Sequence, residues 1–365
     1  MKVLTVGGAM VDTIAIIDSD RIERMTMLNA ETSFLLMEEG RKTEALKIST
    51  HCGGGAINAG VAMARLGADV ATLARVGRDD RAELILQRLM SEGVSTRFVI
   101  RDPNAPTGAS VLVSSHDRNA AIFTFRGANT ALCTDELKDD AFAADLVYIT
   151  SLSNNSADCF PELVKRAKAG NAKVATNPGV RQLSARSGAF FDCLPEIDIL
   201  SINSAEADVL VPSLIADFGE GGPVLPLEAG DTPPRLVARG LSGGGFDMSL
   251  IGFVKAVHKI GVDCIVITDG RDGAVVSQDG NIWHCPVAEN IKVAGTAGAG
   301  DAFAATFSAF HTRGETPDVA LKAATLNAAS VVGHVDTQTG LLNEHSLQKD
   351  VEKLSTSLRL RHWQI

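Results

Sequence analysis

Gly295-Thr296-Ala297-Gly298-Ala299-Gly300-Asp301 leads without interruption into Ala302-Phe303-Ala304-Ala305-Thr306-Phe307, which predicts a glycine-lined turn at the start of a buried helix. Phe303, Phe307 and Phe310 recur at helical spacing with small residues between them, so this helix can pack closely against a sheet. Glycines let the main chain approach a phosphate, and the unpaired amides of a helix N-terminus favour negative charge. The turn is therefore a candidate anion site, formed by Gly298, Ala299 and Gly300.

Asp301 is unexpected beside such a site because a carboxylate repels a resting phosphate. It can, however, take a proton from a hydroxyl group that is about to attack phosphorus, which makes it a candidate general base. The competing interpretation is an ordinary helix-start aspartate in a turn that binds nothing. Other nucleotide-binding signatures are missing from the chain: it has no GxxxxGK[ST] motif, no set of protein-kinase motifs, and no GxGxxG after its first strand.

Composition limits the function classes further. The formal net charge is -10, whereas phosphate backbones are bound through an excess of Lys and Arg, so a nucleic-acid partner is not expected. The six cysteines are scattered without CxxC spacing, which indicates reduced and mostly buried thiols. The N-terminus enters an apolar strand at once, and no apolar run approaches membrane-spanning length. We therefore expect a cytoplasmic protein that acts on small molecules and has no membrane contact.

Apolar runs alternate with amphipathic helical stretches along most of the 365 residues. The expected strands are Val3 to Val6, Val70 to Leu73, Leu146 to Ile149, Val174 to Thr176, Ile199 to Ile202 and Cys264 to Thr268. The clearest helices are Ala56 to Leu66, Arg81 to Glu92, Phe160 to Ala169 and Leu250 to Ile260. This alternation predicts an α/β fold with a doubly wound, mostly parallel sheet covered by helices on both faces.

Two segments interrupt the alternation. Residues 12–50 and 96–126 read as half-buried antiparallel strands, and together they can form a small sheet that covers the strand ends, where open α/β sheets bind ligands. A β-subdomain unrelated to the site is the alternative. Residues 211–246 are rich in Gly and Pro and lack a regular period, which predicts an inserted surface loop. We thus expect one main domain over residues 1–340, with two lid segments and one insertion, and an extension over 341–365 that packs on it.

Two separated motifs of the chain resemble those of the ribokinase, or PfkB, family of carbohydrate kinases. The first is Gly53-Gly54-Gly55-Ala56-Ile57-Asn58-Ala59-Gly60, continuing through Ala64-Arg65-Leu66-Gly67 to Val76-Gly77-Arg78-Asp79. The second is the turn from Thr296 to Asp301 with its small-residue helix. The resemblance spans Leu4 to about Gly340 and is poor across the Gly/Pro-rich segment and the last residues. It implies a ribokinase-like fold with a small β-sheet lid.

For the acceptor, the resemblance implies that Asp12 hydrogen-bonds substrate hydroxyls, that Gly53, Gly54 and Gly55 let amides approach a sugar, and that Asn58 reaches it through its amide. Without the family, Asp12 reads as a turn residue and Asn58 as a helix cap.

For the nucleotide, the resemblance implies that Asn203 and Glu206 form an N-x-x-E element in which Glu206 holds Mg²⁺ through water. It also implies that Thr268, Gly270 and Gly273 lie along ATP and that Asn327 lies near the adenine. A solvated first-turn glutamate, an ordinary strand-end turn and a helix-packing asparagine are the competing explanations.

The family therefore implies an ATP-dependent and Mg²⁺-dependent kinase, with Asp301 as general base and the turn from Gly298 to Gly300 as anion hole. Arg126-Gly127-Ala128-Asn129 resembles the segment before the helical return in ribokinase-like members, which favours a small sugar over a nucleoside. A catalytically silent binding or regulatory protein is the alternative from another class. Gly295 stands where many members carry an Asp that helps hold a monovalent cation, so potassium activation is in doubt. A homodimer joined through the lids is a further hypothesis.

Overall fold

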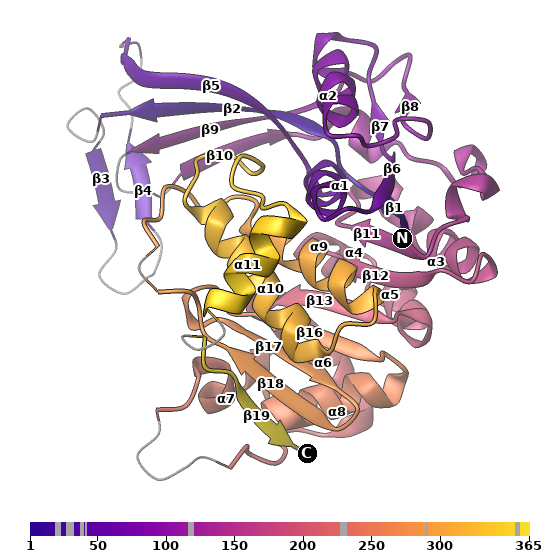
Figure 1. Cartoon of the computed structure of the whole chain (residues 1–365), viewed down its shortest axis with the longest axis vertical. Coiled ribbons are helices and arrows are strands. Elements are labelled where there is room, and N and C mark those ends of the chain that lie inside the picture. The colour runs from indigo at the N-terminus through magenta and orange to yellow at the C-terminus, as the bar shows by residue number, and fades with distance from the viewer. Residues whose placement is uncertain are drawn as a thin grey trace.

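The computed structural model describes residues 1–18, 23–26, 33–36, 40, 42–115, 120–226, 232–289, 291–354 and 358–365. Within these residues the central sheet has nine strands in the order β19-β18-β17-β16-β13-β12-β11-β1-β6 (Figure 1). In chain order they are β1 (Lys2–Val6), β6 (Asp69–Leu73), β11 (Leu146–Thr150), β12 (Lys173–Asn177), β13 (Ile199–Asn203), β16 (Cys264–Thr268), β17 (Ala274–Gln278), β18 (Asn281–Cys285) and β19 (Arg361–Gln364).

The parallel part of this sheet runs from β6 to β16, and β17, β18 and β19 continue it as antiparallel strands. All six apolar runs expected from the sequence are strands of the parallel part. In β11 every residue is buried, as required of a strand covered on both faces. Its side chains alternate between the two cores, with Leu146 and Tyr148 in one and Val147 and Ile149 in the other.

Helices cover both faces of the sheet. Helices α1 (Gly55–Arg65), α2 (Asp80–Ser91), α9 (Ala299–Thr312), α10 (Pro317–Val332) and α11 (Glu344–Leu354) contribute to the core on one face. Helices α3 (Phe160–Ala169), α4 (Val180–Ala185), α5 (Ser187–Cys193), α6 (Ser204–Phe218), α7 (Arg235–Arg239) and α8 (Leu250–Ile260) contribute to the core on the other. The predicted doubly wound architecture is confirmed. None of the described helices is long and apolar enough to cross a membrane.

A second, four-stranded sheet in the order β10-β9-β2-β5 extends away from the main body (Figure 1). Its strands are β2 (Met10–Ile17), β5 (Ala45–Gly53), β9 (Gly108–Ser115) and β10 (Ala120–Phe125). We call it the small sheet. Both predicted lid segments contribute to it, although residues 19–22, 27–32, 37–39, 41 and 116–119 lie outside the described part of the chain. Three further strand pairs are β3 (Glu23–Thr26) with β4 (Ser33–Leu36), β7 (Arg75–Val76) with β8 (Ile100–Arg101), and β14 (Leu241–Gly243) with β15 (Phe246–Met248).

The expectation of a loop over residues 211–246 is wrong at both ends of this segment. Helix α6 continues through Pro212 to Phe218, and α7 and the β14–β15 hairpin occupy the far end, while residues 227–231 lie outside the described part. Pro212 has no amide to bond the carbonyl of Asp208, four residues earlier. Gly243 packs against that carbonyl, because a Cβ at Gly243 would lie 1.9 Å from Asp208 O. The hairpin therefore covers the point where proline leaves one backbone hydrogen bond of the helix unmade.

The C-terminal residues are part of the main sheet. Strand β19 pairs antiparallel with β18 and forms the sheet edge, and α11 contributes Leu347 to the core. The Trp363 indole also donates to Pro226 O at 3.0 Å, which ties this strand to the segment after α6.

Candidate active site

The first turn of α9 lies toward the carboxyl ends of the parallel strands, where the charge of Asp301 acts on Glu206, three residues after the end of β13. Gly298 is the N-cap with a left-handed φ of 79°, and a Cβ there would lie 2.5 Å from Thr337 Cβ. The amides of Gly300 and Asp301 have no acceptor among the described residues, and nothing lies within 4 Å of the Cβ position of Gly300. Open space in front of unpaired amides suits a phosphate group.

Asp301, in the same turn, is held by Asn58 of α1. Asn58 Nδ2 donates to Asp301 Oδ2 at 2.8 Å. Burial raises the pKa of Asp301, the hydrogen bond from Asn58 opposes this rise, and the nearby charge of Asp12 adds to it. The sequence led us to expect Asn58 at the sugar, whereas its amide reaches the carboxylate.

Asp12, on β2 of the small sheet, is the second carboxylate of the site. Ser110 Oγ on β9 donates to Asp12 Oδ1. Burial raises the pKa of Asp12, and this hydrogen bond and the nearby His51 lower it. A Cβ at Gly53 would lie 2.1 Å from Asp12 Oδ2, so glycine at this position leaves room for the carboxylate.

Glycine is needed at positions 54 and 55 because other parts of the chain pack closely against them. Gly54 has φ of 96°, and a Cβ there would lie 2.5 Å from Gly8 O. A Cβ at Gly55 would lie 2.7 Å from Thr150 Oγ1. The start of α1 therefore packs directly against the loop after β1 and the end of β11, which places Asn58 near α9.

Glu206 lies in the first turn of α6 and takes part in a capping box. Asn203 Oδ1 accepts from Glu206 N at 2.8 Å, and Glu206 Oε2 accepts from Asn203 N at 2.9 Å. The residue is only 7% exposed, so it is not the solvated first-turn glutamate of the competing explanation. Burial raises the pKa of Glu206, and the charge of Asp301 contributes to the same rise. Its Oε1 has no hydrogen-bond partner among the described residues.

The segment from Thr268 to Gly273 forms the hairpin turn between β16 and β17. Asp269 N donates to Gly273 O at 2.8 Å, and a Cβ at Gly273, where φ is 90°, would lie 2.1 Å from Cys285 O. The glycine at 273 is thus required by the turn itself.

The expectation of Asn327 beside the adenine needs correction. Asn327 is fully buried, donates to Thr306 Oγ1 at 2.7 Å and accepts from Leu342 N at 2.9 Å. In this structure it joins α10 to α9 and to the segment before α11, and it has no surface to offer a nucleotide.

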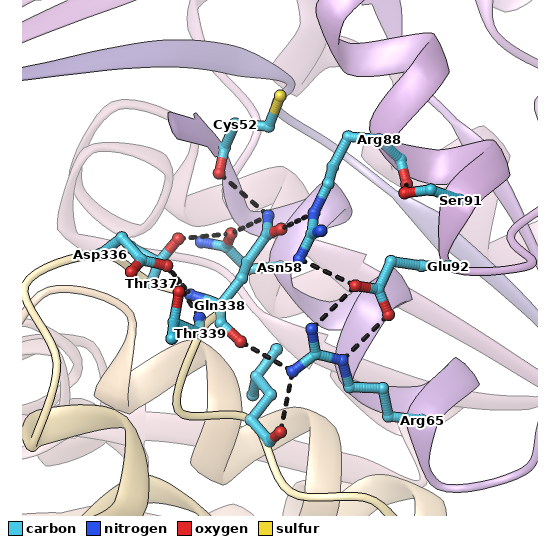
Figure 2. A network of polar contacts seen from close by, with 11 residues as sticks. Cys52, Asn58, Arg65, Arg88, Ser91, Glu92, Asp336, Thr337, Gln338 and Thr339 are labelled. Carbon is cyan, nitrogen blue, oxygen red and sulfur yellow. Dashed lines mark hydrogen bonds and ion pairs between the residues drawn. The ribbon is translucent and has the colours of Figure 1, made fainter. Parts of the chain in front are cut away.

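The structure adds residues that the sequence reasoning missed. Thr337 and Gln338, in the loop before α11, both contact Asn58 (Figure 2). Tyr148 on β11 is fully buried, its hydroxyl has no partner within the described residues, and the charges of Asp301 and Glu206 act on it. Only the motif-like DTQTG at residues 336–340 could have drawn attention to the first two.

Positive charge also lies at this end of the sheet. Arg126, which follows β10, donates to Ser153 Oγ at 2.6 Å, and burial together with the nearby Arg181 lowers its pKa. Neither arginine has a carboxylate partner within 4 Å among the residues described. Two like charges without a counter-charge favour an anionic ligand.

Comparison with known proteins places the chain in a family. The profile of the pfkB family carbohydrate kinases matches residues 19–228 and 246–344. A deoxyribokinase of Salmonella typhi is 26% identical over 332 residues, which cover 89% of this chain and 94% of that protein. An adenosine kinase of Schizosaccharomyces pombe is 26% identical over 259 residues, covering 67% and 68%. A putative ribokinase II from E. coli, solved in complex with ATP and Mg²⁺, has a TM-score of 0.71 at 16% identity, covering 96% of this chain and 99% of the other.

Proposed function

The chain belongs to the pfkB family of carbohydrate kinases, and from that membership we propose that it transfers the γ-phosphate of ATP to a hydroxyl group of a small sugar. The observation that carries the proposal is the arrangement of the first turn of α9. A carboxylate with a raised pKa stands next to two unpaired amides, so a base and an anion hole are adjacent. This pairing is what phosphoryl transfer to an alcohol requires.

The residues present fit ATP and Mg²⁺. The amides of Gly300 and Asp301 face open space, and the Oε1 atom of Glu206 is unpaired beside a second carboxylate. The described residues contain no cluster of three or more ligating side chains, which suits an ion held mainly by phosphates and water. When bound, ATP supplies the phosphoryl group and Mg²⁺ neutralises part of its charge.

Each residue of the site has a separate role in the proposed reaction. Asp12 accepts hydrogen bonds from acceptor hydroxyls and orients the sugar. Asp301, with Oδ2 held by Asn58, takes the proton of the attacking hydroxyl at Oδ1. The amides of the α9 turn stabilise the moving negative charge, Glu206 holds the metal through water, and Arg126 and Arg181 add positive charge at the strand ends. Closure of the small sheet over the site excludes water as a competing acceptor.

The choice of a sugar rests on the face of the small sheet that carries Asp12. In the strand register, Asp12 lies opposite Ser110 on β9, and Ser110 lies opposite Thr124 on β10. The next residues on that face are Ile14, Leu112 and Ile122. On the other side of Asp12, β5 contributes His51 to the same face. A face of mainly hydroxyl and aliphatic side chains suits a small polyol, whereas a nucleobase is usually stacked on an aromatic ring.

A nucleoside is the second candidate acceptor, favoured by the similarity to an adenosine kinase over 67% of the chain. A silent binding protein is disfavoured because the base and the unpaired amides are both retained.

We further propose a homodimer formed through the outer face of the small sheet. Ile48, Val111, Phe123 and Phe125 lie on the face opposite Asp12 and are between 44% and 66% exposed. Exposed apolar side chains clustered on a sheet face are typical of interaction sites.

Monovalent cations are proposed to have little effect. Gly295 provides no carboxylate, and the Cβ position there lies 3.2 Å from His334 O. Rates in K⁺ and in Na⁺ at equal ionic strength should therefore be similar. A large increase in K⁺ would show that main-chain oxygens alone form a cation site.

ADP formation measured across D-ribose, 2-deoxy-D-ribose, adenosine and inosine, with and without Mg²⁺, tests the function. We expect Mg²⁺-dependent turnover with a sugar and little with the nucleosides. Asp301→Asn should reduce kcat by about 10²–10⁴-fold while the affinity for ATP, measured by calorimetry, is retained. Preference for a nucleoside would select the second candidate. ATP binding without phosphoryl transfer to any acceptor would select the silent protein.

A further inference from the structure

Asn58, which donates to Asp301, is connected to helix α2 by a series of polar contacts that runs through Gln338 and Arg88 (Figure 2). Asn58 Oδ1 accepts from Gln338 Nε2 at 3.0 Å and from Thr337 Oγ1 at 2.8 Å. Gln338 Nε2 also donates to Cys52 O at 2.9 Å, and Gln338 Oε1 accepts from Arg88 Nε at 2.8 Å. Asn58 and Gln338 are 4% and 3% exposed, so water has little access to either amide.

The donor and acceptor roles along this series of hydrogen bonds are fixed by Arg88. A guanidinium can only donate, so the oxygen of Gln338 must face Arg88. The nitrogen of Gln338 must then face Cys52 O and Asn58, and Asn58 must present its oxygen to it. The nitrogen of Asn58 is thereby turned to Asp301, where it donates. Thr337 cannot impose this direction, because a hydroxyl group both donates and accepts.

Arg88 is itself held in place. Its NH2 group pairs with Glu92 at 2.8 Å, and Arg65 binds both oxygens of Glu92 at 2.8 and 2.9 Å. Arg65 also donates to the carbonyl oxygens of Gln338 and Leu341 at 2.9 and 2.8 Å, which closes the network on the loop that carries Gln338. All partners of the two amides are thus supplied by the protein.

We propose that Gln338 is a positioning residue for the reaction: it fixes the orientation of the Asn58 amide, so that Asp301 receives a hydrogen bond on Oδ2 and keeps Oδ1 for the substrate hydroxyl. The inference rests on the proposed role of Asp301. Because Cys52 belongs to β5, the same amide also connects the base of the small sheet to the reacting carboxylate. An Asn58 amide in the opposite orientation would place its oxygen against the carboxylate and disfavour the charged form.

Gln338→Glu tests the proposal because it keeps the shape and the acceptor for Arg88 but cannot donate. Asn58 should then turn its nitrogen toward the new carboxylate and its oxygen toward Asp301. We expect kcat/KM to fall by about 10- to 100-fold, with the acid limb of its pH profile moved to higher pH. Gln338→Met, which cannot impose either orientation, should have a smaller effect. It also serves as the second variant if the first folds poorly.

A double-mutant cycle in Tm, measured without ligands, tests the contacts independently of catalysis. With Asn at position 301, the side chain there can donate a hydrogen bond to the oxygen of the reversed Asn58 amide. Gln338→Glu should therefore lower Tm less in the Asp301→Asn background than in the wild type. Gln182→Glu is the matched control, since Gln182 is 2% exposed and lies outside the network. Its effect on Tm should be the same in both backgrounds.

Additive effects of Gln338→Glu and Asp301→Asn on Tm would overturn the proposal. If the two substitutions are coupled in Tm but Gln338→Glu leaves the acid limb of the kcat/KM profile unchanged, the positioning contacts are supported and Asp301 is not the base. The two failures are therefore distinguishable.

Discussion

Three carboxylates define the site at the scale of single residues. Burial is the largest cause of the raised pKa of Asp301, Asp12 and Glu206, and Asp301 acts electrostatically on Glu206 as Asp12 does on Asp301. Keeping all three ionised near neutral pH therefore destabilises the folded protein. Replacing one of the three by a neutral residue should therefore stabilise the fold, as is often found where charged groups serve function.

Asp301→Asn should raise Tm at pH 7, because it removes a charge whose folded-state pKa lies above its unfolded value. The gain should shrink as pH falls through the raised pKa, where wild-type Asp301 takes up a proton and its penalty disappears. Thermal unfolding of both proteins between pH 7 and pH 4 measures this.

Asp102→Asn is a control for which we expect the opposite change in Tm at pH 7. Backbone hydrogen bonds from Ala105 and Asn104, with the Arg75 guanidinium, lower the pKa of Asp102 to about 2. Its stabilisation is present above the unfolded pKa and is lost as pH falls toward the folded one. This variant should therefore have a lower Tm at pH 7, by an amount that decreases in acid. A destabilised Asp301→Asn protein at pH 7 would contradict the account of the site.

Gly53→Ala should displace the Asp12 carboxylate, since its Cβ would lie 2.1 Å from Asp12 Oδ2. We expect KM for the acceptor to rise about 10- to 100-fold, the range for loss of a hydrogen bond to a charged group, with ATP affinity unchanged. Gly188→Ala is the matched control, because nothing lies within 4 Å of that Cβ position. Equal acceptor KM in wild type and Gly53→Ala would remove Asp12 from the acceptor site.

Sequence reasoning could identify Asp301, Asp12 and Asn58 as candidates because each lies in or next to a local motif. The DTQTG segment could draw attention to Gln338, but not to its contact with Asn58, which lies 280 residues away in the sequence. Contacts of this kind depend on how α1 and the loop before α11 pack together, and no local pattern encodes that.

At the scale of elements, apolar periodicity was sufficient where it was regular. Helices α3 and α8 occupy the residues expected from their amphipathic pattern, and α1 and α2 differ by one residue at each end. Pro212 and the nearby glycines concealed the rest of α6, because proline is normally a helix breaker. The antiparallel strands β17, β18 and β19 were missed: β17 and β18 form a hairpin with polar residues in its strands, and β19 pairs with β18 from the far end of the chain.

Removal of residues 359–365 tests the contribution of the C-terminal strand. It exposes β18 as the new sheet edge and removes Trp363 and the stacking of His362 on Trp283 at 5.2 Å. We expect Tm to fall by about 5 °C and aggregation to increase, while kcat/KM stays near the wild-type value because the site lies on other strands. An unchanged Tm would show that β19 does not stabilise the sheet.

At the scale of the whole molecule, helices α9 and α6 of the main body supply Asp301 and Glu206, and strand β2 of the small sheet supplies Asp12. The site is therefore complete only where the main body and the small sheet meet (Figure 1). The overall architecture was predictable because buried strands and amphipathic helices alternate along the chain. Substrate choice was not, since it depends on side chains of the small sheet whose register the sequence leaves open.

The proposed dimer can be tested with a single charge. Phe123→Glu, on an exposed face of the small sheet, should convert a dimer to a monomer in sedimentation velocity and leave Tm of the main domain largely unchanged. Thr124→Glu is not a suitable control because Thr124 lies on the face of Asp12, so Lys165→Glu, on the distant α3, serves instead. A wild-type protein that remains monomeric over a wide concentration range would reject the dimer.

The central claim is that Asp301 removes the proton of the acceptor while the amides of the α9 turn bind the transferred phosphoryl group. The most direct measurement is rapid-quench transfer of labelled γ-phosphate from ATP to the preferred sugar in a single turnover, for wild type and Asp301→Asn, with both proteins saturated with ligands. We predict that the transfer step slows by about 10²–10⁴-fold in the variant and that ATP affinity is equal in the two proteins. Equal transfer rates would contradict the account.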